Sequence, residues 1–255
     1  MNDMPPRALV TGAAKRLGRA QALELARRGF DLAVHYDRSA DEAADTVRAI
    51  EATGRRAVAL RADLAQEAEA AALVPEAEAA LGPVGVLVNN AAIFEFDRPD
   101  SATRASWDRH MEVNLRAPFV LTQHFARRLP PGAHGLVVNL IDQRIWNLTP
   151  NYTSYTVAKV GLWGLTRHLA LALAPRIRVN AIGPGAALPN AGMSDADFER
   201  LAGAVPLQHG TTPDEIARAL GFLLDAPSVT GQMIAIDGGQ HLGWLPPGLS
   251  PADKE

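Results

Sequence analysis

Tyr155 and Lys159 form the pair of residues in this sequence whose types and spacing most directly suggest chemistry. They stand four positions apart within Tyr155-Thr156-Val157-Ala158-Lys159, in a segment with helical periodicity. Both side chains therefore project from one face of a helix. An ammonium beside a phenol stabilises the phenolate and lowers the pKa of the phenol, which suits a general acid in hydride transfer. An isolated pair of this kind is more often a packed or solvated helix contact, so other residues must support the catalytic interpretation.

A glycine-containing turn, Thr11-Gly12-Ala13-Ala14-Lys15-Arg16-Leu17-Gly18, separates the first predicted strand from the first predicted helix. Gly12 permits a tight turn and Gly18 a close approach of helix to sheet, while Arg16 stands where dinucleotide-binding turns usually carry glycine. Backbone N–H groups at a helix N-terminus attract anions, so the turn predicts a pyrophosphate site. Its expected cofactor contacts are Gly12, Lys15, Arg16 and Leu17.

The end of the second predicted strand favours NADPH over NADH. NAD-binding sites place a carboxylate there to hold the ribose hydroxyls, but the residue in this sequence is Tyr36. Arg38 and Ser39 follow it and, with the cations of the glycine-containing turn, could bind a 2'-phosphate. Asp37 opposes this interpretation unless it points to solvent, and Arg38 could equally be a solvated loop residue.

The composition narrows the classes of function. The chain has 255 residues, of which 47% are hydrophobic and 21% charged, enough for a sizeable globular core. A formal net charge of -3 gives no basic surplus for nucleic acid, and the absence of cysteine excludes disulfides and thiolate chemistry. No zinc-binding histidine pattern, secretory signal or membrane-length apolar run is present. We therefore expect a cytoplasmic protein that acts on a small molecule, without metal, nucleic acid or membrane.

Apolar strand-like runs alternate with helix-period segments along the whole chain. This alternation predicts one α/β domain over residues 1–255, a doubly wound Rossmann fold with a parallel sheet of about seven strands. Ser39 and Glu42 predict a capping box at the start of the second helix. Residues 183–212, rich in glycine, proline and alanine, are interpreted as a segment that covers the substrate. The expected strands are 8–10, 32–36, 57–61, 85–89, 135–141, 177–181 and 233–236, and the longest expected helices are 107–128 and 152–173.

Six motifs in order resemble the short-chain dehydrogenase/reductase family over nearly the whole chain: Thr11 to Gly18, Asn89-Asn90-Ala91, Asn114, Tyr155 to Lys159, Gly183-Pro184-Gly185 and Asp237-Gly238-Gly239. The resemblance implies that Tyr155 donates a proton, that Lys159 binds the nicotinamide ribose and tunes Tyr155, and that Asn114 orders a proton-relay water. It also implies a homotetramer that uses the 107–128 and 152–173 helices. Further implied cofactor contacts are Asp63, Leu64, Asn90, Ala91, Ala92, Pro184 and Gly185.

Asp142 departs from this family pattern, because the family's usual catalytic serine should stand at this position. An ionised carboxylate cannot donate a hydrogen bond and would face the oxyanion of a polarised ketone. Like charges at about 4 Å cost on the order of 4 kcal/mol at an effective dielectric near 20, which disfavours a plain carbonyl reductase. A carboxyl suits a substrate with N–H groups or a ring nitrogen that needs a proton.

The sequence is similar in several places to the pteridine reductase branch of that family, which includes dihydromonapterin reductases. The similar places are Arg16, the segment His35 to Ala40, Phe94 and Asp142. The resemblance implies that a pterin stacks between nicotinamide and Phe94, and that Arg16 reaches the pterin or the cofactor phosphate. Ala92 and Ile93 lack the hydroxyls found in some of these enzymes, and the expected substrate contacts are Arg16, Phe94, Asp142 and Tyr155, with Trp146 and Tyr152 as further candidates for the pocket wall.

Three functions follow from these residues. The first is an NADPH-dependent reductase of a dihydropteridine, which Asp142 beside Tyr155 and Lys159 favours. The second is a carbonyl or 3-oxoacyl reductase of the same family that tolerates Asp142. The third is a non-catalytic NADPH-binding sensor, which the intact set of Asn114, Tyr155 and Lys159 disfavours because a binding module needs no proton relay.

Overall fold

The computed structural model describes residues 3–189 and 193–243. Seven parallel strands form one sheet in the order β3-β2-β1-β4-β5-β6-β7, which confirms the predicted doubly wound α/β fold. The strand order reverses between β1 and β4, and in such sheets ligands bind at the carboxyl ends of the strands beside this point. The strands are β1 (Arg7–Val10), β2 (Asp31–Tyr36), β3 (Ala57–Arg61), β4 (Val86–Asn89), β5 (Gly135–Leu140), β6 (Ile177–Pro184) and β7 (Met233–Ile236).

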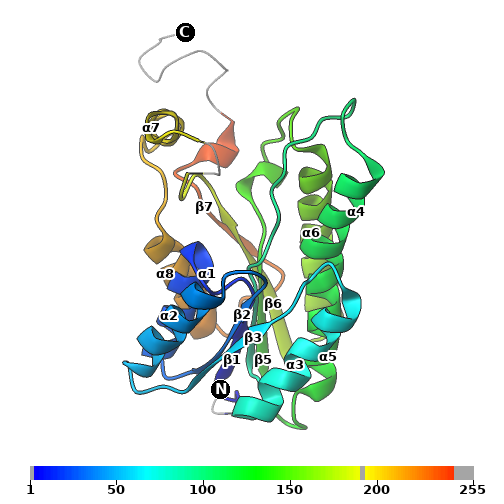
Figure 1. Cartoon of the computed structure of the whole chain (residues 1–255), viewed down its shortest axis with the longest axis vertical. Coiled ribbons are helices and arrows are strands. Elements are labelled where there is room, and N and C mark those ends of the chain that lie inside the picture. The colour runs from blue at the N-terminus through cyan, green and yellow to red at the C-terminus, as the bar shows by residue number, and fades with distance from the viewer. Residues whose placement is uncertain (1–2, 190–192, 244–255) are drawn as a thin grey trace.

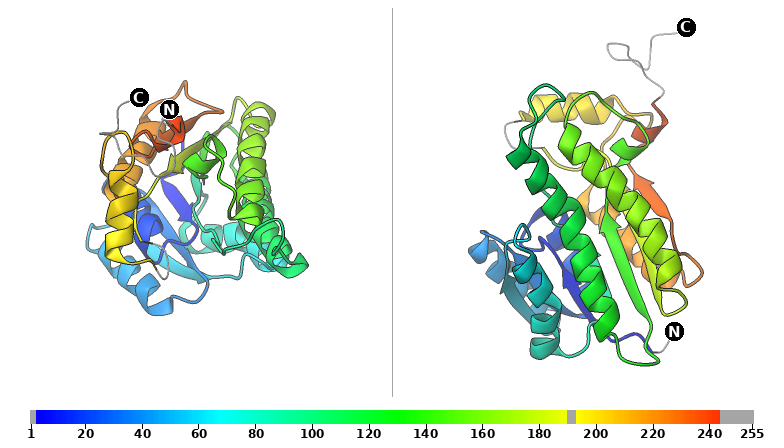
Figure 2. Two further views of the ribbon diagram at one scale, coloured as in Figure 1. Left: turned by 90° about the horizontal axis from the view of Figure 1, so that it is seen from above. Right: turned by 90° about the vertical axis from the view of Figure 1, so that its right-hand side faces the viewer.

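Helices cover both faces of the sheet, as Figures 1 and 2 show. On one face lie α1 (Arg16–Arg27), α2 (Ala40–Glu51) and α8 (Pro213–Asp225), and on the other α3 (Glu67–Leu81), α5 (Ala117–Arg128) and α6 (Thr153–Ala172). Successive residues of β1 face opposite layers, with Leu9 in one core and Ala8 and Val10 in the other. Burial on both faces explains why the strands read as continuous apolar runs.

The helix predicted over residues 107–128 is present without a gap, but it begins at Arg104 and contains a π-helical turn that the sequence did not predict. The chain forms α4 (Arg104–Met111), a π-helical turn (Glu112–Arg116) and then α5. In an α-helix the N–H of residue 118 would bond the carbonyl of Asn114, but Pro118 has no N–H. Pro118 instead occupies the first turn of α5, where that N–H is not needed.

The predicted capping box of Ser39 and Glu42 is absent from the start of α2. Ser39 stands at the N-cap of α2 but makes no capping hydrogen bond through its side chain. Glu42 faces Lys15 instead, with 3.6 Å between Nζ and Oε1. The Glu42 carboxylate therefore lies near the phosphate turn and does not cap its own helix.

The segment after β6 leads into α7 (Asp195–Gly203), at the end of the molecule opposite the N-terminus (Figure 1). Residues 190–192 of the predicted covering segment 183–212 lie outside the described residues. Within the described part of the chain, no helix has the length and apolar character needed to cross a membrane. The same described residues contain no group of three or more candidate metal ligands.

Candidate active site

A cleft of about 970 Å³ opens at the carboxyl ends of the strands. It receives residues from the loops that follow β1, β2, β3, β4, β5 and β6, and from α6 and α7. Asn114 does not line the cleft. The other predicted site residues all do: Gly12, Lys15, Arg16, Leu17, Tyr36, Arg38, Ser39, Asp63, Leu64, Asn90, Ala91, Ala92, Phe94, Asp142, Tyr155, Lys159, Pro184 and Gly185.

The turn between β1 and α1 is built for close approach of backbone. A Cβ atom on Gly18 would lie 2.2 Å from the carbonyl oxygen of Gly12, so only glycine fits there. Arg16 adopts φ +54°, a left-handed conformation that costs a non-glycine residue on the order of 1 kcal/mol or more. Its guanidinium Nη2 donates to the Pro189 carbonyl at 3.0 Å. Arg16 thus joins the turn to the segment that follows β6.

The first amides of this turn donate hydrogen bonds within the protein, whereas the start of α1 has no side-chain cap. Gly12 N–H donates to Nδ1 of His35 at 3.0 Å, and Ala13 N–H donates to the His35 carbonyl at 2.9 Å. Lys15, the N-cap of α1, offers no capping side chain, and the first turn holds no acidic residue. The positive end of the α1 dipole therefore lacks an internal anion, which fits a bound pyrophosphate.

Cations surround the position where a 2'-phosphate would lie. Lys15 pairs with Glu42, and Asp37 lies 3.3 Å from Arg38 and 3.9 Å from Arg61. These side chains are exposed, so each pair contributes little and is easily exchanged for a phosphate contact. Two arginines offset the charge of Asp37, which removes the main objection to NADPH that the sequence raised.

Asn90 holds the turn against the end of β4. Its Nδ2 donates to the carbonyls of Thr11 at 2.8 Å and Gly12 at 3.2 Å, and Gln21 donates to its Oδ1 at 3.0 Å. Thr11 Oγ1 accepts from the backbone N–H of Asn90 at 2.9 Å. The switch point of the sheet is therefore fixed by a polar network before any ligand binds.

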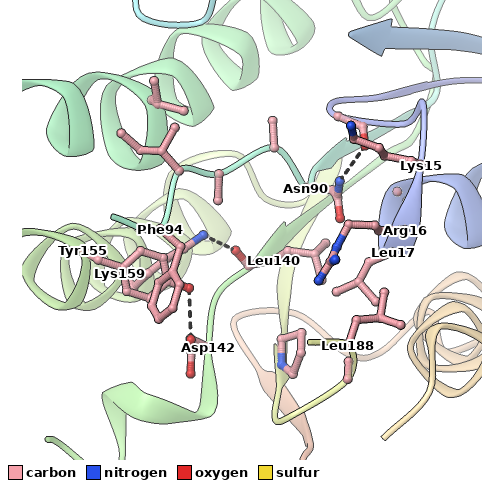
Figure 3. A pocket seen from close by; sticks show the side chains of 18 of the residues that line it. Lys15, Arg16, Leu17, Asn90, Phe94, Leu140, Asp142, Tyr155, Lys159 and Leu188 are labelled. Carbon is pink, nitrogen blue, oxygen red and sulfur yellow. Dashed lines mark hydrogen bonds between the residues drawn. The ribbon is translucent and has the colours of Figure 1, made fainter. Parts of the chain in front are cut away.

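Tyr155, Asp142 and Lys159 converge on the floor of the cleft (Figure 3). The Tyr155 hydroxyl donates to Oδ2 of Asp142 at 3.0 Å, and Oδ1 of Asp142 accepts from the Arg144 backbone N–H at 2.8 Å. Lys159 Nζ donates to the Leu140 carbonyl at 2.7 Å. A carboxyl thus occupies the place next to the phenol where a serine was expected from the family pattern.

Burial dominates the pKa values of these three groups. It raises the pKa of Asp142 above the usual range of a carboxyl, against the hydrogen bond from Arg144. Burial, followed by the charge of Asp142, raises the pKa of Tyr155 well above its ordinary value. Burial lowers the pKa of Lys159 to about 8. The prediction that Lys159 brings the pKa of Tyr155 toward neutrality is therefore wrong for this arrangement, because the phenol faces a carboxylate and the ammonium faces a carbonyl.

Asn114 is fully buried and serves the loop after β4. Its Oδ1 accepts from the Ile93 N–H and its Nδ2 donates to the Ile93 carbonyl, each at 2.9 Å. The amide therefore cannot order a water in the cleft through its side chain. Its effect on the site is to position the residue before Phe94.

Phe94 lies at the substrate end of the cleft beside Tyr155, with ring centroids 4.6 Å apart (Figure 3). Tyr152 stacks on Phe94 at 4.1 Å, so a flat substrate would have only the other face of Phe94. Neither Tyr152 nor Trp146 lines the cleft, contrary to expectation. Trp146 packs instead against Trp163, and Tyr152 supports Phe94 from behind.

Sequence reasoning missed several cleft residues. The Arg144 guanidinium lies 5.7 Å from the ring centroid of Phe94 and 5.1 Å from that of Tyr152. Its place two residues after Asp142 was the available signal. The remaining missed residues come together only through the tertiary fold and include His35, Glu95, Arg109, Gln143, Leu188, Met193, Phe198, Leu201 and Gln240.

Comparisons with known proteins agree with this geometry. Residues 12–241 match the family model described as enoyl-(acyl carrier protein) reductase. The structure of the FolM alternative dihydrofolate reductase 1 from Brucella suis with NADP is 45% identical, with TM-score 0.91 over 96% of this chain and 98% of that one. Its Brucella canis counterpart with NADP is 44% identical, with TM-score 0.90 over the same shares. The 3-oxoacyl-[acyl-carrier-protein] reductase FabG of Staphylococcus epidermidis is 33% identical over 92% of this chain and 98% of its own. The chain belongs to the short-chain dehydrogenase/reductase family and is an oxidoreductase that binds NADP(H).

Proposed function

We propose that this protein is an NADPH-dependent reductase whose substrate is a dihydropteridine or a closely similar nitrogen heterocycle. The observation that carries the proposal is the hydrogen bond from Tyr155 to Asp142, whose pKa burial raises. Because burial favours the neutral form of this carboxyl, Asp142 can hold a proton and pass it to the phenol. A serine hydroxyl at this position could orient a carbonyl but could not supply that proton.

Tyr155, Asp142 and Lys159 each have a separate role in the proposed reaction. Bound NADPH supplies a hydride to a ring carbon of the substrate. The adjoining ring nitrogen gains basicity as the hydride arrives and takes the proton of Tyr155, and Asp142 then reprotonates Tyr155. Lys159 would contact the nicotinamide ribose and would place a positive charge beside the acid pair.

The walls of the cleft support a flat, polar substrate. Phe94 lines the cleft with one ring face stacked on Tyr152, and a pterin would stack on its other face, against the nicotinamide. Arg16 reaches from the phosphate turn to Pro189, so it can contact both cofactor and substrate. Residues 183–212 contribute Leu188 and Met193 to the cleft, which supports their role as the covering segment. The two FolM structures, named as alternative dihydrofolate reductases, favour the same substrate class.

A 3-oxoacyl or other carbonyl reductase is the second candidate, favoured by the identity to FabG of Staphylococcus epidermidis. Asp142 opposes it. A carboxylate near a developing oxyanion raises the barrier by on the order of 4 kcal/mol, or about a thousandfold in rate. A ketone would therefore react well only while Asp142 is protonated.

The test is NADPH oxidation with 7,8-dihydrobiopterin, dihydromonapterin and dihydrofolate against a panel of ketones and a 3-oxoacyl thioester. We expect turnover of a pterin that Tyr155→Phe and Asp142→Ala abolish. In Asp142→Ser we expect pterin turnover to fall and ketone turnover to rise. Ketone turnover alone in the unaltered protein would refute the pteridine proposal, and NADPH binding without turnover of any of these compounds would favour a sensor.

We further propose that copies of this chain associate through α4, α5 and α6 into a tetramer. An apolar groove there has Gly161 and Gly164 on its floor, flanked by Leu115, Phe119 and Leu165. Glycines let a second helix approach closely, and a face of this kind favours a partner copy. Light scattering on the unaltered protein and on Gly164→Arg tests this: a tetramer that the substitution dissociates is expected, and a monomer in both would refute it.

A further inference from the structure

His35 is a buried histidine at the end of β2 whose ring joins two loops of the cleft. It is 2% exposed and lines the cleft. Its Nδ1 lies 3.0 Å from the Gly12 nitrogen, and its Nε2 lies 3.0 Å from the Ala62 carbonyl oxygen. Gly12 begins the phosphate turn after β1, and Ala62 directly follows β3. The ring therefore bridges the carboxyl ends of three neighbouring strands.

The partners of His35 define its protonation state. A backbone N–H can only donate, so Nδ1 must be an unprotonated acceptor. A carbonyl can only accept, so Nε2 must carry the hydrogen. Only one neutral tautomer satisfies both contacts, and burial, the largest effect on this group, lowers the pKa of His35 below its ordinary value.

The contact with Gly12 has consequences for cofactor binding. Gly12 has φ +62°, and its carbonyl accepts from Asn90 at 3.2 Å, so His35 and Asn90 hold the two sides of one residue. The Gly12 carbonyl oxygen is also the atom against which Gly18 packs. Moving Gly12 therefore moves the start of α1 and the amides that would face the pyrophosphate.

We propose that His35 is a positioning residue for NADP(H): by accepting the Gly12 N–H on Nδ1 it sets the phosphate turn in the conformation that receives the pyrophosphate. The Nε2 contact with Ala62 orients the ring and does not itself set the turn. This inference concerns the cofactor, so it stands or falls independently of the pteridine proposal.

Two substitutions, each of which keeps one of the two ring contacts, distinguish the role of Nδ1 from that of Nε2. In His35→Asn the side-chain oxygen is bonded to Cγ, as Nδ1 is in histidine, and can still accept from the Gly12 N–H. In His35→Gln the amide nitrogen lies where Nε2 was and can still donate to Ala62, but nothing accepts from Gly12. Each variant loses one buried hydrogen bond, so a purely structural role predicts similar losses of stability and of affinity.

The measurement is the dissociation constant of NADP⁺ by isothermal titration calorimetry at neutral pH, with thermal unfolding of each variant beside it. We expect His35→Gln to bind at least tenfold more weakly, a change of about 1.4 kcal/mol, and His35→Asn to stay within about threefold of the unaltered protein. His134 is an exposed histidine directly before β5, at the amino ends of the strands; His134→Gln is the matched control and should bind as the unaltered protein does. Equal affinities of the two His35 variants, or weaker binding by His35→Asn, would overturn the proposal even where both melt at the same temperature.

Discussion

Replacing Lys159 with methionine should change how the stability of the protein depends on pH. Burial lowers the pKa of Lys159 from 10.5 to about 8, and the side chain is 2% exposed. A pKa lowered by about 2.5 corresponds to ~3 kcal/mol of free energy spent on keeping the buried ammonium charged. Above about pH 8 the folded protein releases this proton, while the unfolded chain keeps it until about pH 10.5.

The sign of the effect follows from proton binding. Between those two pKa values the unfolded state holds more protons, so the unaltered protein gains stability as pH rises. Lys159→Met lacks this gain. The free energy of unfolding of the unaltered protein should therefore rise relative to that of Lys159→Met by ~3 kcal/mol from about pH 7 to about pH 11.

Urea unfolding of both proteins at several pH values measures this difference. Lys15→Met controls for the loss of an ammonium from the surface, where Lys15 is 56% exposed in its side chain. The loss of the bond to the Leu140 carbonyl alters the gap at every pH equally, so only the change of the gap with pH counts. A gap that stays constant within error across this range would refute the assignment of a strongly perturbed ammonium.

Two further predictions concern the residues around Tyr155. Asp142→Asn keeps an acceptor for the phenol but removes the charge that, after burial, raises the pKa of Tyr155, so Tyr155 should ionise at lower pH. Phenolate absorbance during an alkaline titration, with Tyr155→Phe subtracted, detects this, and unchanged curves would contradict it. Asp97 is 3% exposed and accepts from the N–H of Ser154 at 3.1 Å and from its hydroxyl, at the start of α6. Asp97→Ala should destabilise the protein by about 2–4 kcal/mol and lower kcat more than it raises KM; an unfolding midpoint within error of the unaltered protein would argue against this anchor.

The sequence predicted the sheet well because each strand is buried on both faces and therefore reads as an unbroken apolar run. The predictions from sequence failed at two places in the helices. A π-helical turn (Glu112–Arg116) lies within a helix that periodicity made uniform, and Glu42 lies near Lys15 instead of capping its own helix. The second outcome depends on a neighbour that is distant in sequence.

In the cleft, too, the sequence predicted some features, and others are determined only by the folded chain. Spacing was enough to bring Tyr155 and Lys159 to one helix face, but it could not tell which group each would bond. The pKa values depend on burial and on the partners Asp142 and Leu140, and these are properties of the folded chain. Arg144 was within reach of sequence reasoning, since it stands two residues after the departure from the family pattern.

The exchange of a serine for Asp142 alters the proton content of the site as well as its hydrogen bonds. Burial raises the pKa of Asp142 and lowers that of Lys159, so the two groups approach each other in proton affinity. Reduction of a ring C=N bond consumes one hydride and one proton, and the ring nitrogen must receive that proton where water is excluded. In its protonated form, the carboxyl of Asp142 provides the proton that a nitrogen heterocycle requires.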